Sequence, residues 1–139
     1  MRIVVDTNVV ISGVFFGGVP QRILEAVVTQ EVTACATPEI VEEYQRVVEE
    51  MIDRRLGHIH RDVLMPFITE LALYSPHTKI SVCRDPDDDK FLACALDSSS
   101  YYIVSGDKDL LDMKHYQGVT IVTAADFCKR FLSDTDRWA

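Results

Sequence analysis

The sequence predicts an α/β fold with a mostly parallel central sheet. Short apolar runs that suit buried strands alternate along the chain with segments of helical periodicity. Strands of a parallel sheet are buried on both faces and are joined by helices, so this alternation is typical of the class. The length of 139 residues predicts one domain, residues 1–139.

The N-terminal segment predicts one strand and two helices. Residues 2–5 form a short apolar run that ends at Asp6, as expected of a buried strand. Residues 9–16 predict a helix that is closed by a pair of glycines. Pro20 suits the first position of a second helix, whose apolar residues fall on one face.

A second strand and a longer helix follow. Residues 33–36 predict the strand. Thr37 and Pro38 then suit the N-cap and the first position of a helix. Apolar residues recur with a period near 3.6 from Ile40 to Met51, which predicts a helix through that stretch.

The second half of the chain continues the alternation. Residues 61–74 predict one helix or two, because Pro66 would kink or restart a helix. Residues 80–83 predict a short extended segment, and a helix is expected from Asp85 to about Asp97. Two strands and a final helix complete the chain: residues 101–104, 119–122 and 124–132.

Composition excludes several classes of protein. A net charge of -8 and a pI near 4.8 argue against a protein that holds nucleic acid by bulk positive charge. No apolar stretch approaches 18 residues and no targeting segment is visible, so we expect a cytoplasmic protein without membrane association. The four cysteines form no CxxC pair and lie in or beside apolar runs, which predicts buried, reduced thiols. The histidines match no metal spacing, and we expect His58 and His60 to be a surface pair.

Several carboxylates fall where an α/β fold binds ligands, outside the carboxyl ends of the strands. Asp6 directly follows the first strand, and Asp107 and Asp109 follow the strand 101–104. Acids at such positions also cap helices. Thr7 and Asn8 are themselves good caps, which leaves Asp6 free for another role.

Helical geometry adds two more acids. At 100° per residue, Glu43 flanks the apolar stripe of the 38–51 helix, whereas Glu42 faces water. The run from Asp85 to Asp89 holds four acids in five residues, more than one helix start can use. Asp89 lies three residues before an apolar leucine and points with the apolar side, although the angle of Asp88 is also tolerable.

A cluster of such acids without basic partners requires cations. Oxygen-only ligands select hard divalent ions such as Mg²⁺ or Mn²⁺. One or two ions of this kind can activate water and stabilise the leaving oxygen in phosphodiester hydrolysis. The sequence therefore predicts a metal-dependent hydrolase.

The chain resembles the PIN-domain ribonucleases, and within them the VapC-like toxins of type II toxin–antitoxin systems. Each matching stretch is weak alone, but together they follow in order across essentially the whole chain. They are residues 4–9 (VVDTNV), 37–44 (TPEIVEEY), 85–93 (DPDDDKFLA), 104–110 (VSGDKDL) and 120–127 (TIVTAADF).

The resemblance implies a site as well as a fold. It places the four family acids, as catalytic residues and metal ligands, on Asp6, Glu43, Asp89 and Asp107. Asp109 is a further candidate ligand, Asn8 or Thr7 is the small polar residue near the first acid, and Ser105 orients the turn at Asp107. It also implies a doubly wound α/β/α sandwich, cleavage of single-stranded RNA with Mg²⁺ or Mn²⁺, a homodimer, and inhibition by a small antitoxin protein.

Two alternatives remain open at this point. A haloacid-dehalogenase-like phosphatase also places an Asp after its first strand and uses a Gly-Asp turn, but it needs a second Asp where this chain has Asn8. A non-catalytic PIN-like module that binds RNA or protein is the other, although such modules typically lose one or more of the acids.

The acidic net charge excludes strong non-specific binding to nucleic acid and does not exclude a metal-dependent nuclease.

Overall fold

The computed structural model describes residues 1–54 and 61–132. Within these residues six strands form one sheet in the order β3-β2-β1-β4-β6-β5. Five strands are parallel, and β5 pairs antiparallel with β6. The strands are β1 (Arg2–Val5), β2 (Thr33–Ala36), β3 (Ala72–Leu73), β4 (Tyr102–Val104), β5 (His115–Tyr116) and β6 (Val119–Val122). The predicted α/β class with a mostly parallel sheet is confirmed.

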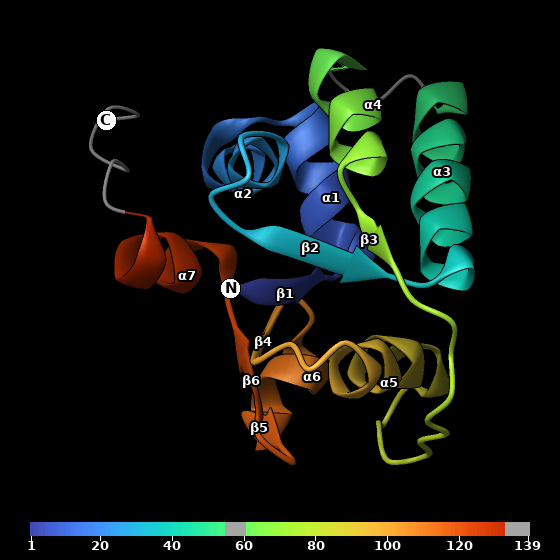
Figure 1. Cartoon of the computed structure of the whole chain (residues 1–139). Coiled ribbons are helices and arrows are strands. Elements are labelled where there is room, and N and C mark those ends of the chain that lie inside the picture. Colours follow the sequence, from blue (N-terminus) through green and yellow to red (C-terminus); the bar gives the residue numbers. More distant parts are fainter. Residues whose placement is uncertain (55–60, 133–139) are drawn as a thin grey trace.

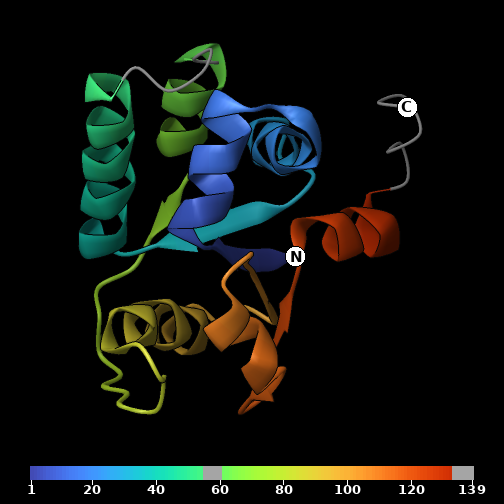
Figure 2. The same ribbon diagram turned by 180° about the vertical axis from the view of Figure 1, so that it is seen from behind.

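Helices cover both faces of this sheet. Figures 1 and 2 show α1 to α4 on one side and α5 and α6 on the other, with α7 packed near α2. The helices are α1 (Thr7–Phe15), α2 (Gly18–Val28), α3 (Pro38–Asp53), α4 (Arg61–Thr69), α5 (Asp89–Asp97), α6 (Lys108–Met113) and α7 (Ala124–Phe131). A short 3₁₀ turn, η1 (Pro86–Asp88), precedes α5.

The strand order creates a switch point in the middle of the sheet. From β1 the chain builds outward through β2 and β3 on one side, and through β4 and β6 on the other. β1 and β4 are parallel neighbours, with Val5 opposite Val104, so their carboxyl ends lie side by side. A ligand site in an open α/β sheet is expected at such a point.

The structure differs from the predicted elements in three places. Residues 61–74 are one helix with Pro66 inside it, followed by the short strand β3. Residues 80–83 belong to no strand. The elements α6, β5 and β3 are not predicted from the sequence, because a segment of two to six residues is too short to show a hydrophobic period. His58 and His60 lie outside the described residues.

The cysteines are free thiols. Cys35, Cys94 and Cys128 are buried, as predicted, whereas Cys83 is half-buried. Burial is the main cause that raises the pKa of Cys94 to about 12, so this thiol stays protonated and unreactive near neutral pH.

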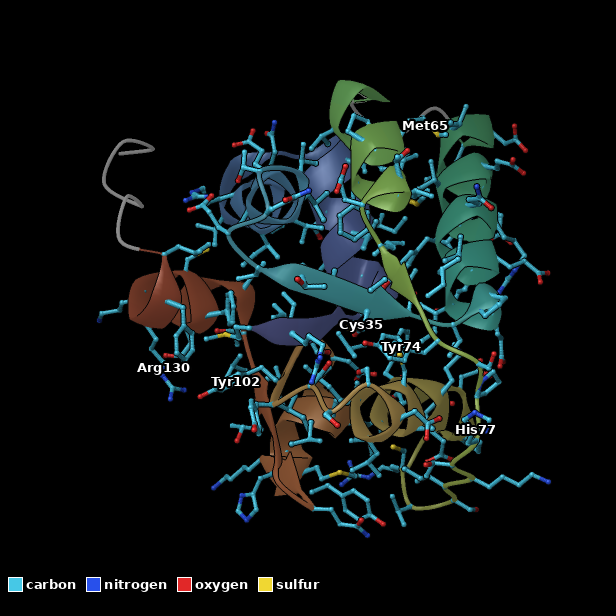
Figure 3. All side chains as sticks on the ribbon, viewed as in Figure 1. Cys35, Met65, Tyr74, His77, Tyr102 and Arg130 are labelled. Carbon is cyan, nitrogen blue, oxygen red and sulfur yellow. The ribbon has the colours of Figure 1, made fainter. Side chains whose placement is uncertain are left out.

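An aromatic cluster fixes α7 against the sheet. The Tyr102 ring lies 6.1 Å from that of Phe127 and 4.9 Å from that of Phe131, centre to centre. Figure 3 shows Arg130 near Tyr102, and its guanidinium carbon lies 5.6 Å from the centre of the tyrosine ring.

In the described part of the chain, no single helix is long and apolar enough to cross a membrane. Among the described helices, the pair α1 and α2 taken together reaches the length and composition of a span, but the two are bent by 104° relative to each other. Most of the α1 residues are buried inside the protein.

Candidate active site

Two acids, Asp6 and Asp107, lie where β1 and β4 end. Asp6 follows β1 and is only 4 % exposed, and the fully buried Ser105 follows β4. The Ser105 hydroxyl donates to Asp6 Oδ2 at 2.6 Å and accepts from the backbone N–H of Asp107 at 2.9 Å. One serine therefore holds Asp6 and the Asp107 turn together, across the switch point of the sheet.

Asp107 is the N-cap of α6. Its Oδ1 accepts from the backbone N–H of Asp109 at 2.9 Å, which leaves its second oxygen free of that bond. Asp109 itself pairs with the exposed Arg84, at 2.9 Å from Oδ1 to Nη1. The structure thus turns Asp109, a predicted additional ligand, toward Arg84.

The third acid brought to the cluster is Asp88. It is buried, and its Oδ2 accepts no hydrogen bond from the described residues. Burial is the largest cause that raises the pKa of Asp88 to about 7. Asp107 raises the pKa of Asp88 further, because the two carboxyl groups can form a hydrogen bond only when they share a proton. The charge of Asp6 also raises the pKa of Asp88.

Asp89, the acid chosen from the sequence, has different partners. Its Oδ1 accepts from the backbone N–H groups of Cys83 at 2.9 Å and Val82 at 3.2 Å. Partial desolvation acts to raise the pKa of Asp89, but these hydrogen bonds outweigh it and hold the pKa below its usual range. Asp89 therefore fastens the preceding loop to α5.

The difference between the two acids has a local cause. The sequence predicts one α-helix over residues 85–97, but residues 86–88 form a 3₁₀ turn, which rotates by 120° per residue. Asp88 also precedes the buried Phe91 by three residues and the buried Leu92 by four. This double spacing was visible in the sequence and favours Asp88 as the residue on the buried face.

Glu43 lies on α3 at the edge of the cluster. It accepts a short hydrogen bond from the Thr7 hydroxyl. Lys90 pairs with it at 2.8 Å from Nζ to Oε1, and Arg46 approaches the same oxygen at 3.9 Å. The cluster therefore does have a basic partner, contrary to the sequence prediction: the half-buried Lys90 neutralises Glu43.

Tyr44 anchors α3 to the end of β1. The tyrosine is fully buried, and its hydroxyl donates a short hydrogen bond to the carbonyl oxygen of Val5, next to Asp6. Burial raises the pKa of Tyr44 well above its usual range, so the hydroxyl stays a donor. In the sequence Tyr44 was only one of the apolar positions of the helix.

Replacing Tyr44 by phenylalanine is expected to destabilise the fold. The variant keeps the ring in the core but removes the donor to the Val5 carbonyl, which costs about 1–2 kcal/mol. The free energy of unfolding in urea is the measurement. Tyr116→Phe, at a more exposed tyrosine of β5, serves as the control and should change stability by less; an equal loss would contradict the anchoring role.

Asn8 was predicted to orient the site. Its backbone N–H binds the Asp6 carboxylate and lowers the pKa of Asp6, but its side chain is exposed and has no hydrogen-bond partner among the described residues. The side-chain contacts to the acids come instead from Thr7 and Ser105.

Burial dominates the electrostatics of Asp6. Desolvation is the largest cause that raises its pKa, and the charges of Asp107 and Glu43 add to the rise. Hydrogen bonds from Ser105 and the Asn8 N–H oppose it. A carboxylate in such surroundings is stabilised by a cation.

The donor set has the chemistry of a site for a hard divalent ion. Among the described residues, no three carboxylate, imidazole or thiol side chains are close enough together to hold a metal ion. The four nearby acids nevertheless offer oxygen ligands only, and the buried Asp88 Oδ2 lacks a donor. These are the properties that Mg²⁺ and Mn²⁺ require of a ligand set.

Removing Lys90 is expected to expose the charge of Glu43. Lys90→Met should lower the stability of the metal-free protein by about 1–3 kcal/mol, because the pair is mostly buried. Added Mg²⁺ should then stabilise the variant more than the wild type. Urea unfolding with and without Mg²⁺ measures both effects, and Arg84→Met, at a mostly exposed pair, is the control. Equal stabilisation of wild type and variant would contradict this role of Lys90.

Comparison with known proteins identifies the class. Residues 2–109 match the PIN domain family, and the chain belongs to that family. PIN domains are in general nucleases, and they usually act with divalent metal ions.

A particular relative supports the assignment. The uncharacterized protein MJ1680 of Methanocaldococcus jannaschii is 31 % identical over 118 residues, which cover 82 % of this chain and 76 % of that protein. No solved structure gives a significant match.

Proposed function

We propose that this protein is a metal-dependent endoribonuclease that hydrolyses phosphodiester bonds of single-stranded RNA. The observation that carries the proposal is the meeting of Asp6, Asp88 and Asp107 at the switch point of a PIN-type sheet, with Ser105 joining two of them. The pKa values of Asp6 and Asp88 are both raised, chiefly by burial and in part by the charge of Asp107, and carboxylates in such surroundings suit a cation site.

Asp6, Asp88 and Asp107 would hold one or two Mg²⁺ or Mn²⁺ ions, with Glu43 at the edge and Thr7 fixing its side chain. The bound ion would supply Lewis acidity, for activation of water and for stabilisation of the leaving oxygen. Ser105 keeps Asp6 and Asp107 in register, and Asp89 holds the loop before α5. Lys90 is the cation nearest to Glu43 among the described residues, and it would contact an RNA phosphate once a metal ion shares that acid.

RNA cleavage with and without metal tests this proposal. Purified protein is incubated with a labelled single-stranded RNA in Mn²⁺, in Mg²⁺ and in chelator, beside a single-stranded DNA of the same sequence. We expect internal cleavage of the RNA that depends on the metal. Calorimetric titration should show binding of Mn²⁺. Absence of divalent-ion binding would contradict the proposal. A phosphatase would leave the RNA intact and would form an acyl phosphate on Asp6.

The biological role proposed is that of a VapC-like toxin. The resemblance of residues 4–9, 37–44 and 104–110 to that branch supports it. The branch also implies a homodimer and a small antitoxin protein, and we propose both for this protein. We place the protein, as a single domain, in the cytoplasm. Expression in a bacterial host should arrest growth, and co-expression of the neighbouring small reading frame should restore it; growth unaffected by the active protein would favour a role in RNA processing.

A further inference from the structure

A cavity lies beside the carboxylate cluster. It has a volume of about 400 Å³ and is bounded by the start of α1, the start of α7 and the turn after β4. Ser105 and Gly106 belong to its lining. Since Ser105 also binds Asp6 and the N–H of Asp107, the cavity shares a wall with the candidate active site. The volume lies within the range of small-ligand pockets, roughly 300–1,000 Å³.

The lining of this cavity is neutral. None of the described residues that form it carries a charge. A second cavity, of about 350 Å³, lies between α3 and α5 and is lined by Lys79 and Lys90 as well as two acids. A phosphate in the neutral cavity would find no cation and would lie beside the carboxylates, so the chemistry favours an uncharged ligand group.

The neutral cavity offers hydrogen bonds that the protein does not use. Asn8 and Ser12 are four residues apart on α1 and therefore lie on one face of that helix. Neither side chain has a hydrogen-bond partner within the described part of the chain. An amide and a hydroxyl supply both donors and acceptors. Val19 and Ala124 add apolar contacts, and the space above Gly106 is open.

We propose that this cavity binds one unpaired nucleobase of the RNA substrate, next to the scissile phosphate. The proposal rests on the ribonuclease function given above and adds a specificity site to it. Proteins read single-stranded RNA by taking an unstacked base into a pocket and hydrogen-bonding its edge. Asn8 and Ser12 contact the edge of the base here, and the apolar residues cover its faces. The lining is uncharged, so a base would be selected by hydrogen bonds and apolar contacts. Such selection does not need the excess of basic residues that this acidic protein lacks.

Binding of free nucleosides tests the cavity independently of catalysis. The four ribonucleosides, which carry no phosphate, are titrated without metal into isotope-labelled protein, and amide NMR shifts are followed. At least one nucleoside should shift the amides of Asn8, Ser12 and Gly106. Ala125→Trp fills the cavity and should abolish these shifts, whereas Lys129→Trp, one turn further along α7 and exposed, should preserve them. If no nucleoside shifts these amides, the proposal is overturned. A pocket that binds a protein partner instead would give that result.

Cleavage of RNA libraries tests the specificity itself. The wild type should prefer one base at a fixed position beside the cut. Ser12→Val should change that preference by about tenfold, since one hydrogen bond to the base is lost. An unchanged preference in both Ser12→Val and Ala125→Trp would overturn the nucleobase site and leave the nuclease intact. Nucleoside binding that Ala125→Trp abolishes, in a protein that cleaves no RNA, would support the site and reject the proposed nuclease.

Discussion

Replacing Asp6 or Asp107 by asparagine is expected to abolish RNA cleavage and to leave the fold at least as stable. Each acid belongs to the cluster that would hold the metal, so its loss should lower kcat/KM by about 10³-fold or more. The amide oxygen can still accept the Ser105 hydrogen bond in Asp6→Asn. Because burial and neighbouring charges raise the pKa of Asp6, removing the charge relieves repulsion in the metal-free protein.

The measurements are single-turnover RNA cleavage in Mn²⁺ and thermal unfolding in chelator. Asp53→Asn, at the exposed C-terminal end of α3, is the matched control and should keep full activity. If Asp6→Asn cleaved RNA as fast as Asp53→Asn, the carboxylate cluster would not be the active site. A variant that lost activity only because it unfolded would show a lower unfolding temperature, opposite to the expected change.

The metal-free protein is expected to lose stability as the pH rises through about 7, and Asp88→Asn should remove much of that loss. Burial and the proton shared with Asp107 raise the pKa of Asp88 from 3.8 to about 7. Between these values the folded protein binds a proton that the unfolded chain lacks. The resulting stabilisation is complete below about pH 4 and disappears above about pH 7.

Thermal unfolding between pH 5 and pH 8.5 in chelator checks this expectation. Asp88→Asn should have the higher unfolding temperature at pH 8.5 and a flatter pH profile. Asp87→Asn, at the exposed neighbour, should follow the wild-type profile. Mg²⁺ should stabilise the wild type more at pH 8 than at pH 5.5, because protons compete with the ion for the same oxygens. Identical profiles for Asp88→Asn and the wild type would show that Asp88 does not bind this proton.

The fold was predictable from the sequence where the strands are apolar and the helices are long. Residues 33–36 and 119–122 match β2 and β6, and the Thr37–Pro38 start of α3 holds, with the Thr37 hydroxyl accepting from the backbone N–H of Ile40. β3 and β5 have two residues each and are defined by pairing with a neighbour, which no local pattern reports.

For the site, the sequence reveals the acids more easily than their partners. Asp6 and Asp107 follow strand ends, a position that residue order alone displays. The pairing of Lys90 with Glu43 joins α5 to α3 and depends on tertiary packing. For the third acid, the spacing of Asp88 to Phe91 and Leu92 is a signal in the sequence, but the 3₁₀ turn of residues 86–88 and the hydrogen bonds that hold Asp89 to the preceding loop are not.

The hydrogen bond from Ser105 to Asp6 has a consequence for the synthesis of the protein. It joins residues 99 positions apart, and Asp107 follows two residues later, so the cluster draws on both ends of the family match. Contacts between such distant residues form late in folding, since the chain must first close a long loop. We therefore expect a growing chain on the ribosome to remain inert toward nearby RNA until β4 and α6 have emerged and docked.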